Sequence, residues 1–333
     1  MASAVQNWAE ILRTQNLAAD RAMDEVSRWL LITRASVFPM TVLSAVIGGL
    51  LAARAPDAHW GYFALCLIGL VAAHAANNMI NDYFDLEGGV DSESYVRAQY
   101  APHPVLSGLI SKTGLLVAIA VVNLLDLGLL LYLTEHRGWP VALFALLGLF
   151  VSVGYVAPPF KLKHRGLGEP GVLLVWGPLM IGGTYYVTTG SFAPWVLVAS
   201  LPYAMLVTAV LMGKHIDKLD ADAAKGIHTL PVILGRERAT FLTQELLVGF
   251  FVAVVLLVLV GTLGAWTLLV VLALPRLWQV LGVLSKPPPA EPPPRYPLWP
   301  LWYVSWSFLV TRRAGGLFVL GLLLDAIHPI HLA

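Results

Sequence analysis

The sequence predicts an all-α, polytopic membrane helical bundle with about nine transmembrane helices. Hydrophobic residues make up 58% of the 333 residues and charged residues only 12%, which is too few to cover a soluble surface of this size. Apolar runs of roughly twenty residues recur along the chain, as spanning helices require. The basic residues gather between alternate runs, which is the loop pattern of a multi-pass protein.

Two parts are expected, an N-terminal segment (1–35) and a membrane domain (36–333). Met23, Val26 and Trp29 fall largely on one side of a helix over 20–34, which predicts an amphipathic helix on the membrane surface. A solvated helix packed on the protein's own loops is the alternative. The predicted spans lie at about 36–53, 59–80, 113–134, 139–157, 170–189, 194–212, 241–262, 265–284 and 314–330. The Trp-rich stretch 298–310 is either an interfacial helix or part of a span.

Charge distribution predicts the orientation of the bundle. All 21 Lys and Arg residues except Arg54 and Arg137 precede the first span or lie in or beside the loops on that side. The N-terminus and the long polar loops are therefore expected in the cytosol. The polar N-terminus argues against a signal peptide, and a net charge of +1 against a nucleic-acid partner. With Cys66 as the single cysteine, a disulfide framework and a Cys-based zinc site are excluded.

The stretch His74–Asp91, HAANNMINDYFDLEGGVD, carries the densest group of polar residues in an apolar run. Asn77, Asn81 and Asp85 are four residues apart and share one helix face. Polar groups are costly in hydrocarbon unless they face a cavity or a ligand, and oxygen ligands of this kind suit Mg²⁺ bound to phosphates. A polar cluster satisfied at a helix end is the alternative. Gly88 and Gly89 should end the helix and turn Asp91 back towards it.

A second stretch, GKHIDKLDADAAKGIHTLP (213–231), mixes carboxylates with lysines. Lys214, Lys218 and Asp222 form one helical stripe, with Asp217 and Asp220 beside it. We interpret it as the other half of the same polar site, since its cations can pair with phosphate oxygens. The alternative is a salt-bridged, solvated loop helix.

A third stretch, YVAPPFKLKHRGLGEPG (155–171), is basic. It holds Lys161, Lys163, His164 and Arg165 beside a glycine-containing turn, and Tyr155 stands at the preceding helix end. Such a cluster of cations binds either a diphosphate or the anionic headgroups of lipids.

Together these stretches resemble the UbiA superfamily of intramembrane prenyltransferases, from about Trp29 onward. NDYFDLEGGVD is similar to its first aspartate-rich motif, and the Gly-Gly-Val-Asp ending resembles the branch that prenylates 1,4-dihydroxy-2-naphthoate or related quinone precursors. The segments RGLGE (165–169), GPLMIGGTYY (177–186) and KGIHTLPVILG (225–235) also look like the family. The resemblance implies helices around a central, lipid-facing cavity, and Mg²⁺-dependent transfer of an isoprenyl group from an isoprenyl diphosphate to an aromatic or other lipophilic acceptor.

The resemblance also implies roles for particular residues. The expected catalytic residues are Asp82, Asp85, Lys218 and Asp222. The expected diphosphate-binding residues are Asn78, Arg97, Tyr155, Lys161, Lys163, Lys214 and Lys218. The expected Mg²⁺ ligands are Asn81, Asp85, Asp91, Asp217 and Asp222. The partners implied are the isoprenyl diphosphate, the acceptor and membrane lipid, with the active site facing the cytoplasm.

The second motif departs from the family pattern. Where the family usually has an Asn and two Asp four residues apart, this chain has Lys214, Lys218 and Asp222. Either the ammonium groups neutralise phosphate directly in place of a metal, or Asp217 and Asp220 supply ligands from a shifted register. After the first motif, the family's Arg-Pro is His103-Pro104.

The departure keeps two other hypotheses open. An intramembrane terpene cyclase would use the same allylic cation without an acceptor. A non-catalytic lipid-binding or transport protein would keep the fold and lose the chemistry.

Overall fold

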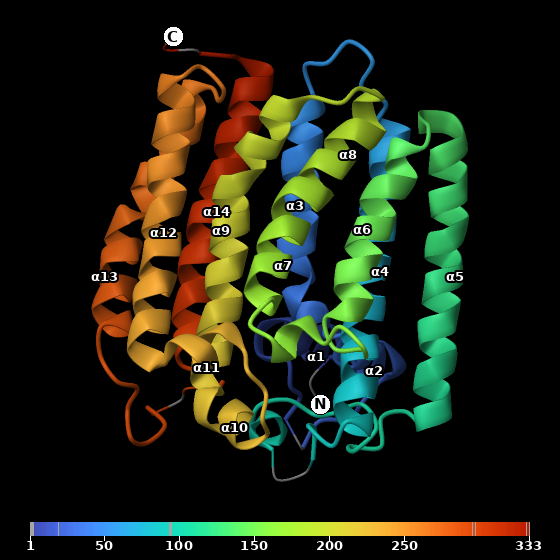
Figure 1. The fold of residues 1–333 in the computed structure, drawn as a ribbon, viewed down its shortest axis with the longest axis vertical. Coiled ribbons are helices and arrows are strands. Elements are labelled where there is room, and N and C mark those ends of the chain that lie inside the picture. Colours follow the sequence, from blue (N-terminus) through green and yellow to red (C-terminus); the bar gives the residue numbers. More distant parts are fainter. Residues whose placement is uncertain are drawn as a thin grey trace.

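The computed structural model describes residues 3–18, 20–92, 95–294, 296, 298–330 and 332, and the regular elements among them are helices. The larger helices are α3 (Phe38–Ala52), α4 (Trp60–Glu87), α5 (Lys112–Arg137), α6 (Pro140–Gly154), α7 (Gly168–Leu174), α8 (Met180–Thr189), α9 (Pro194–Asp217), α12 (Arg236–Leu259), α13 (Leu274–Leu284) and α14 (Tyr303–Ile327). They run side by side along the long axis of the molecule (Figure 1).

Several of these helices join into longer segments. A π-helical segment, η4 (Val175–Leu179), connects α7 to α8, and a 3₁₀ segment, η5 (Ala265–Ala273), leads into α13. With α3 extended by η1 (Ala35–Val37), eight described segments are long and apolar enough to cross a membrane. The 15-residue α6 is shorter and lies in the same bundle. The all-α bundle of about nine helices is thus confirmed.

Sequence signals explain where these helices begin. Pro39, Pro140, Pro194 and Pro275 stand in the first turns of α3, α6, α9 and α13, where a missing N–H costs nothing. Ser111 caps α5, because its Oγ accepts a hydrogen bond from the backbone N–H of Gly114 at 3.0 Å.

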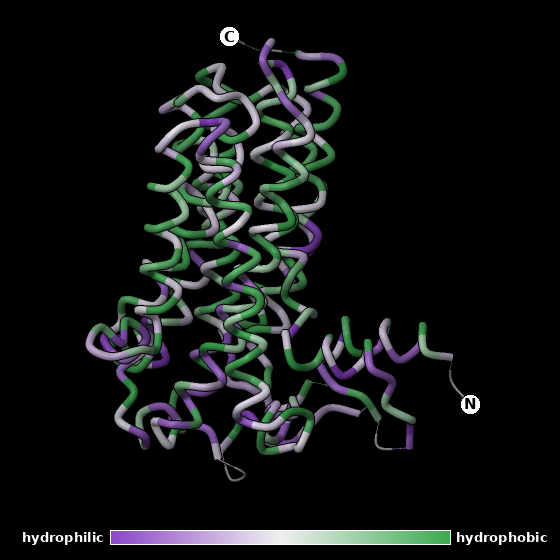
Figure 2. Tube along the Cα trace, turned by 90° about the vertical axis from the view of Figure 1, so that its right-hand side faces the viewer, coloured by the Kyte–Doolittle hydropathy of each residue, from purple (hydrophilic) through white to green (hydrophobic). Residues whose placement is uncertain are grey.

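Short helices gather at one end of the bundle, which we call the polar end. They are α1 (Ala4–Thr14), α2 (Glu25–Ile32), α10 (Leu219–Ala224) and α11 (Leu230–Leu234). The bundle is mostly hydrophobic along its length, whereas α1 and α2 project sideways from it (Figure 2). Val5 on α1 and Trp29 on α2 are exposed, and so is Met23 in the segment between them. Their contact with the membrane surface stays a prediction.

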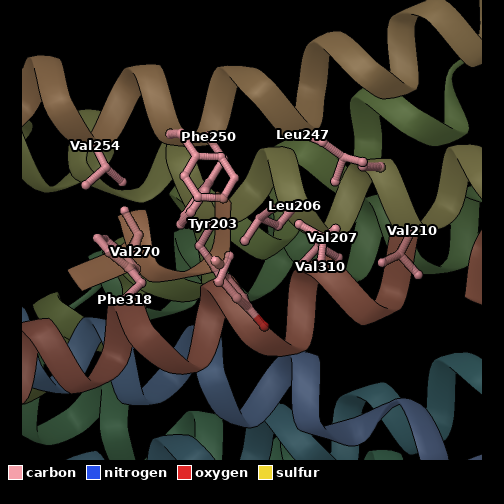
Figure 3. Close-up of a cluster of buried hydrophobic side chains, with 14 of the residues drawn as sticks. Tyr203, Leu206, Val207, Val210, Leu247, Phe250, Val254, Val270, Val310 and Phe318 are labelled. Atoms are coloured by element: carbon pink, nitrogen blue, oxygen red, sulfur yellow. The ribbon is translucent and has the colours of Figure 1, made fainter. Parts of the chain in front are cut away.

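One half of the bundle, which we call the packed half, consists of α9, α12, η5, α13 and α14. Its core holds Tyr203, Leu206, Phe250 and Phe318, each with 0% exposure (Figure 3). The helices approach closely at a glycine. A Cβ atom on Gly213 would lie 2.8 Å from the Cα of Val304, so α9 and α14 could not approach this closely with a larger residue there.

The other half, which we call the hollow half, consists of α4, α5, α6 and α8. These helices line a cavity of about 500 Å³, to which α3, α7 and α9 add part of the wall. The wall runs from Asn81 and Lys214 at the polar end to Leu133, Val141 and Val187 near the opposite end. Most of the lining is aliphatic or aromatic.

The structure moves three predicted boundaries. The last span, expected at 314–330, begins earlier: α14 starts at Tyr303, so the Trp-rich stretch 298–310 is largely part of a span, one of the two interpretations of it. The second span was expected to end near residue 80, but α4 continues to Glu87, so the first polar stretch is largely helical. The long loop at 213–240 is shorter than expected and contains α10 and α11.

Candidate active site at the polar end

The last turns of α4 carry the first group of carboxylates. Asp82 and Asp85 lie on the helix, which ends at Gly88. Gly89 then adopts a φ of +68°, and the chain turns back so that the N–H of Asp91 donates to the Asp85 carbonyl at 3.0 Å. The expected return of Asp91 towards the helix is what this turn produces.

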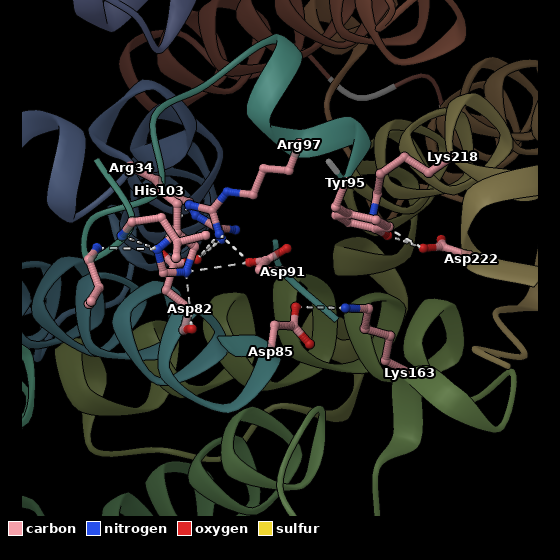
Figure 4. A network of polar contacts seen from close by, with 12 residues as sticks. Arg34, Asp82, Asp85, Asp91, Tyr95, Arg97, His103, Lys163, Lys218 and Asp222 are labelled. Atoms are coloured by element: carbon pink, nitrogen blue, oxygen red, sulfur yellow. Dashed lines mark hydrogen bonds and ion pairs between the residues drawn. The ribbon is translucent and has the colours of Figure 1, made fainter. Parts of the chain in front are cut away.

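Asp82 lies at the centre of a buried ion cluster (Figure 4). Its Oδ1 accepts from both Arg34 and Arg97, and its Oδ2 accepts from Arg97 at 3.0 Å. Arg97 also donates to Asp91 at 2.9 Å. Both oxygens of Asp82 are therefore engaged, and its exposure is 0%. Asp82 thereby fixes two segments against α4: the residues just before α3 and the 3₁₀ segment η2 (Val96–Gln99). This structural role differs from the catalytic role expected for Asp82.

His103 completes this cluster at the side of Asp91. Its Nε2 lies 3.6 Å from the Asp91 Oδ2. Burial, together with the positive charge of Arg97, lowers the pKa of His103 to about 4, so it is neutral at physiological pH. Asp82, Asp91 and His103 present ligand atoms close together, but the guanidinium of Arg97 already occupies the two carboxylates. A metal cation there would face that positive charge, so we place no metal among these three.

Asp85 lies nearly one turn further along α4 and faces the basic stretch (Figure 4). Lys163, in the 3₁₀ segment η3 (Leu162–His164), donates to its Oδ2 at 2.8 Å. Both side chains are buried. The second oxygen of Asp85 has no polar partner among the described residues. Lys161 lies one residue before η3, and its ammonium makes no ion pair within the described part of the chain.

The second polar stretch forms a buried group with a residue that sequence analysis missed. The Tyr95 hydroxyl donates to Asp222 Oδ1, and Lys218 donates to Tyr95 at 3.0 Å and lies 3.4 Å from Asp222 (Figure 4). Burial opposes ionisation of Asp222, but the neighbouring cations, Lys218 first among them, and the Tyr95 hydrogen bond together outweigh it, and the pKa of Asp222 lies below its usual value. The same carboxylate and burial raise the pKa of Tyr95. Tyr95 carries no sequence signal, because it stands in an irregular loop.

Some polar atoms at this end have no hydrogen-bond partner. Asn81 Oδ1 and Asp222 Oδ2 are buried without a donor among the described residues. Lys214 lines the cavity and likewise has no polar partner within the described chain. Amide and carboxylate oxygens without donors fit a hard divalent cation such as Mg²⁺, and a free ammonium fits an anion.

Other expected site residues are engaged elsewhere. Both oxygens of Asp217 accept backbone N–H groups at the start of α14, from Tyr303 at 2.8 Å and from Val304 at 2.9 Å. Asp217 therefore caps a helix, and the structure removes it from the expected Mg²⁺ ligands. Asp220 pairs with Arg236 at the surface, so the shifted register is not formed. Asn78 donates to the Thr33 carbonyl at 2.9 Å, and only its remaining atoms face the cavity.

A second buried chain of polar groups was also missed. His215 Nδ1 lies 2.6 Å from Glu169 Oε1, and its Nε2 lies 3.4 Å from the Tyr155 hydroxyl. Glu169 and His215 are 1% and 2% exposed, while Tyr155 forms part of the cavity wall. Two helices, α7 and α9, thus orient Tyr155 towards the cavity. The spacing of 46 residues between Glu169 and His215 hid this contact from sequence analysis.

Comparison with known proteins agrees with this arrangement. The model of the UbiA prenyltransferase family matches residues 41–323, which is most of the chain. The chain belongs to the UbiA prenyltransferase family. It is 30% identical to the 2-carboxy-1,4-naphthoquinone phytyltransferase of Synechocystis sp., over 68% of this chain and 70% of that protein. It is 27% identical to the 1,4-dihydroxy-2-naphthoate octaprenyltransferase of Haemophilus influenzae, over 64% of this chain and 70% of that protein.

Solved structures share the UbiA fold. The apo UbiA homologue of Aeropyrum pernix K1 has a TM-score of 0.64 at 17% identity, covering 86% of this chain and 97% of that one. A UbiA homologue from Archaeoglobus fulgidus, bound to DMAPP and Mg²⁺, has a TM-score of 0.60 at 16% identity, covering 87% and 99%. This UbiA-family chain is thus an integral, multi-pass membrane protein and a prenyltransferase, as predicted.

Proposed function

We propose that this protein transfers an isoprenyl group from an isoprenyl diphosphate to a naphthoate-type aromatic acceptor, with Mg²⁺ as cofactor. One observation carries the proposal: polar atoms of Asn81 and Lys214, without partners among the described residues, line the polar end, or mouth, of an apolar cavity. A diphosphate fits the mouth, and a hydrocarbon tail fits the cavity. The relatives named as naphthoate prenyltransferases support the acceptor class, and the Archaeoglobus fulgidus homologue with DMAPP and Mg²⁺ supports the donor and the ion.

In this proposal some side chains bind the ion and others stabilise the charge of the diphosphate. Asn81 and Asp85 have oxygens without donors among the described residues and would hold the ion, and Asp222 offers one such oxygen on the α9–α10 side. The ion would supply positive charge to the departing diphosphate. Lys163, Lys214 and Lys218 add fixed positive charge where negative charge grows on the leaving oxygens.

Arg97 contributes by holding the carboxylates of Asp82 and Asp91 in place. The apolar wall keeps water from the allylic cation until the acceptor attacks it. On the charge distribution of the loops, this end faces the cytoplasm.

The test is a transfer assay with the full-length protein in liposomes, using geranyl diphosphate and 1,4-dihydroxy-2-naphthoate. We expect a prenylated naphthoate with Mg²⁺ and none after chelation with EDTA. Asp85→Ala should lower the rate about 100-fold or more, since it removes charge stabilisation at the reacting centre. Glu87→Ala is the matched control, because Glu87 lies on the same helix and pairs with Lys112 at the surface.

Other products would overturn the proposal. Conversion of geranyl diphosphate to a cyclic hydrocarbon or alcohol, without use of the acceptor, would identify a cyclase. Binding of the diphosphate without any release of inorganic pyrophosphate would identify a non-catalytic protein.

A further inference from the structure

Cations outnumber carboxylates among the charged side chains that meet around Asp82, Asp85 and Asp222. Nine charged side chains meet there, and all but Lys214 are buried. Four are negative, Asp82, Asp85, Asp91 and Asp222, and four of the positive ones, Arg34, Arg97, Lys163 and Lys218, lie among them. The fifth positive side chain is Lys214 on the cavity wall. Glu169 and His215 form their own pair beside this group. Counted with all nine groups ionised, the site has one positive charge in excess before any ligand enters.

The excess limits how many metal ions a bound diphosphate can bring with it. An isoprenyl diphosphate carries a charge of about −3 at neutral pH. Added to the site, it leaves two negative charges uncompensated, and one divalent cation neutralises them. A second divalent cation would leave two positive charges, which are expensive to keep in a buried site of low dielectric constant.

The contacts agree with the charge count. On α4, Asn81 and Asp85 lie one turn apart, and each has an oxygen that no donor in the described part of the chain reaches. On the α9–α10 side, Asp222 offers one such oxygen, while its other oxygen receives Tyr95 and lies 3.4 Å from the Lys218 ammonium. A second metal ion on that side would meet the charges of Lys218 and Lys214.

We propose that the site takes a single divalent cation with its diphosphate, on the Asn81 and Asp85 side, and that Lys214 and Lys218 supply the charge a second ion would bring. The proposal rests on the function proposed above. It assigns the two lysines a task that the geometry on α9 explains: Lys214 faces the cavity without a carboxylate partner, and Lys218 is fixed by Tyr95 and Asp222.

The test counts bound ions rather than turnover. The purified full-length protein is dialysed to equilibrium against Mn²⁺ and an unreactive thiolodiphosphate analogue of geranyl diphosphate. Manganese, phosphorus and protein are then measured in both chambers by elemental analysis. We expect about one Mn²⁺ for each bound analogue, at saturation, in the wild-type protein.

Two variants sharpen the count. Lys214→Asn combined with Lys218→Asp removes two positive charges and adds a carboxylate, so it should bind about two Mn²⁺ for each analogue. Lys225→Asn is the control, because Lys225 lies outside the site and donates to the Gly89 carbonyl, and its count should stay at about one. Gel filtration and circular dichroism report whether each variant is folded.

The ion counts distinguish failure of the single-ion inference from failure of the proposed function. Two Mn²⁺ for each analogue in the wild-type protein would overturn the single-ion inference and leave the proposed function intact. Binding of the analogue with no Mn²⁺, or no binding of the analogue, would overturn the metal-dependent function itself. A folded double variant that still binds one ion would show that the lysines do not stand in for a second one. If the double variant does not fold, the wild-type count still decides the inference.

Discussion

The packed half and the hollow half of the bundle differ in what their side chains bury. Within the most apolar stretch of each helix, 72% of α9 is buried against 11% of α5. Packed-half helices pack through large side chains such as Phe250 and Phe318, whose ring centroids lie 5.9 Å apart. Hollow-half helices line a cavity on one side and leave much of α5 uncovered on the other. The mean hydropathies of the spans overlap, at 1.5 to 2.4 in the packed half and 1.2 to 2.4 in the hollow half, so hydrophobicity alone does not distinguish a core from a substrate chamber.

The two halves are stabilised by different interactions. The packed half is stabilised by close packing along its whole length. The hollow half keeps space for a ligand, and its polar contacts are concentrated at the polar end, around Asp82 and Asp85. Substitutions should therefore act by different mechanisms in the two halves.

Asp82→Ala should have the largest effect. It leaves the guanidiniums of Arg34 and Arg97 buried with their main partner removed, which typically costs about 3–5 kcal/mol. We expect a lower unfolding free energy in detergent and loss of prenyl transfer, because η2 is released. Asp220→Ala breaks an exposed ion pair with Arg236 and should change stability by less than about 1 kcal/mol. Equal effects of the two variants would contradict the importance of the buried cluster.

Phe250→Ala should be nearly as damaging to stability but not directly to the chemistry. Phe250 is fully buried in the packed half, and the void left by its removal should lower the unfolding free energy by about 3–5 kcal/mol. Phe144→Ala removes the same ring from the cavity wall, where space already exists, so the loss should be smaller. Unfolding of both variants in mixed detergent micelles measures the contrast. A larger loss for Phe144→Ala would break the distinction between the halves.

Asp217→Ala tests the junction of α9 and α14 inside the packed half. The substitution leaves two backbone N–H groups of α14 without an acceptor, at a cost of about 1–3 kcal/mol. Binding of Mn²⁺ with the diphosphate analogue should be unchanged, measured by the same equilibrium dialysis. Loss of the ion in a folded Asp217→Ala protein would return Asp217 to the set of metal ligands.

Leu133→Trp should have the smallest energetic effect of these substitutions, and its effect on transfer should depend on the length of the isoprenyl chain. Leu133 lines the cavity near the end opposite Asn81, so a larger side chain shortens the space for the tail. We expect transfer from long isoprenyl diphosphates to fall about tenfold, equivalent to roughly 1.4 kcal/mol, while transfer from five- and ten-carbon donors stays unchanged. A uniform loss across all chain lengths would show that the tail does not occupy this end.

Sequence patterns were sufficient for the fold because the spanning helices depend on local hydrophobicity. They also located α4 and the second polar stretch as two parts of one polar region. Sequence patterns could not assign different roles to Asp82 and Asp85. In the structure Asp82 pairs with Arg34 and Arg97, whereas Asp85 pairs with Lys163. Tyr95, Glu169 and His215 were missed because their partners lie far away in the chain. Asp217 was misjudged because a helix cap and a metal ligand look alike in a sequence.

The 28-residue length of α4 has a consequence for how a substrate arrives. A helix of that length extends about 42 Å, whereas the hydrocarbon layer of a bilayer is about 30 Å thick. Measured from Trp60, Asn81 lies about 32 Å and Asp85 about 38 Å along the helix, so a helix that starts at one edge of that layer carries Asn81 to the other edge and Asp85 to the level of the headgroups. An amphiphilic donor can then move sideways out of the leaflet with its anionic head at one constant depth and its tail never crossing water.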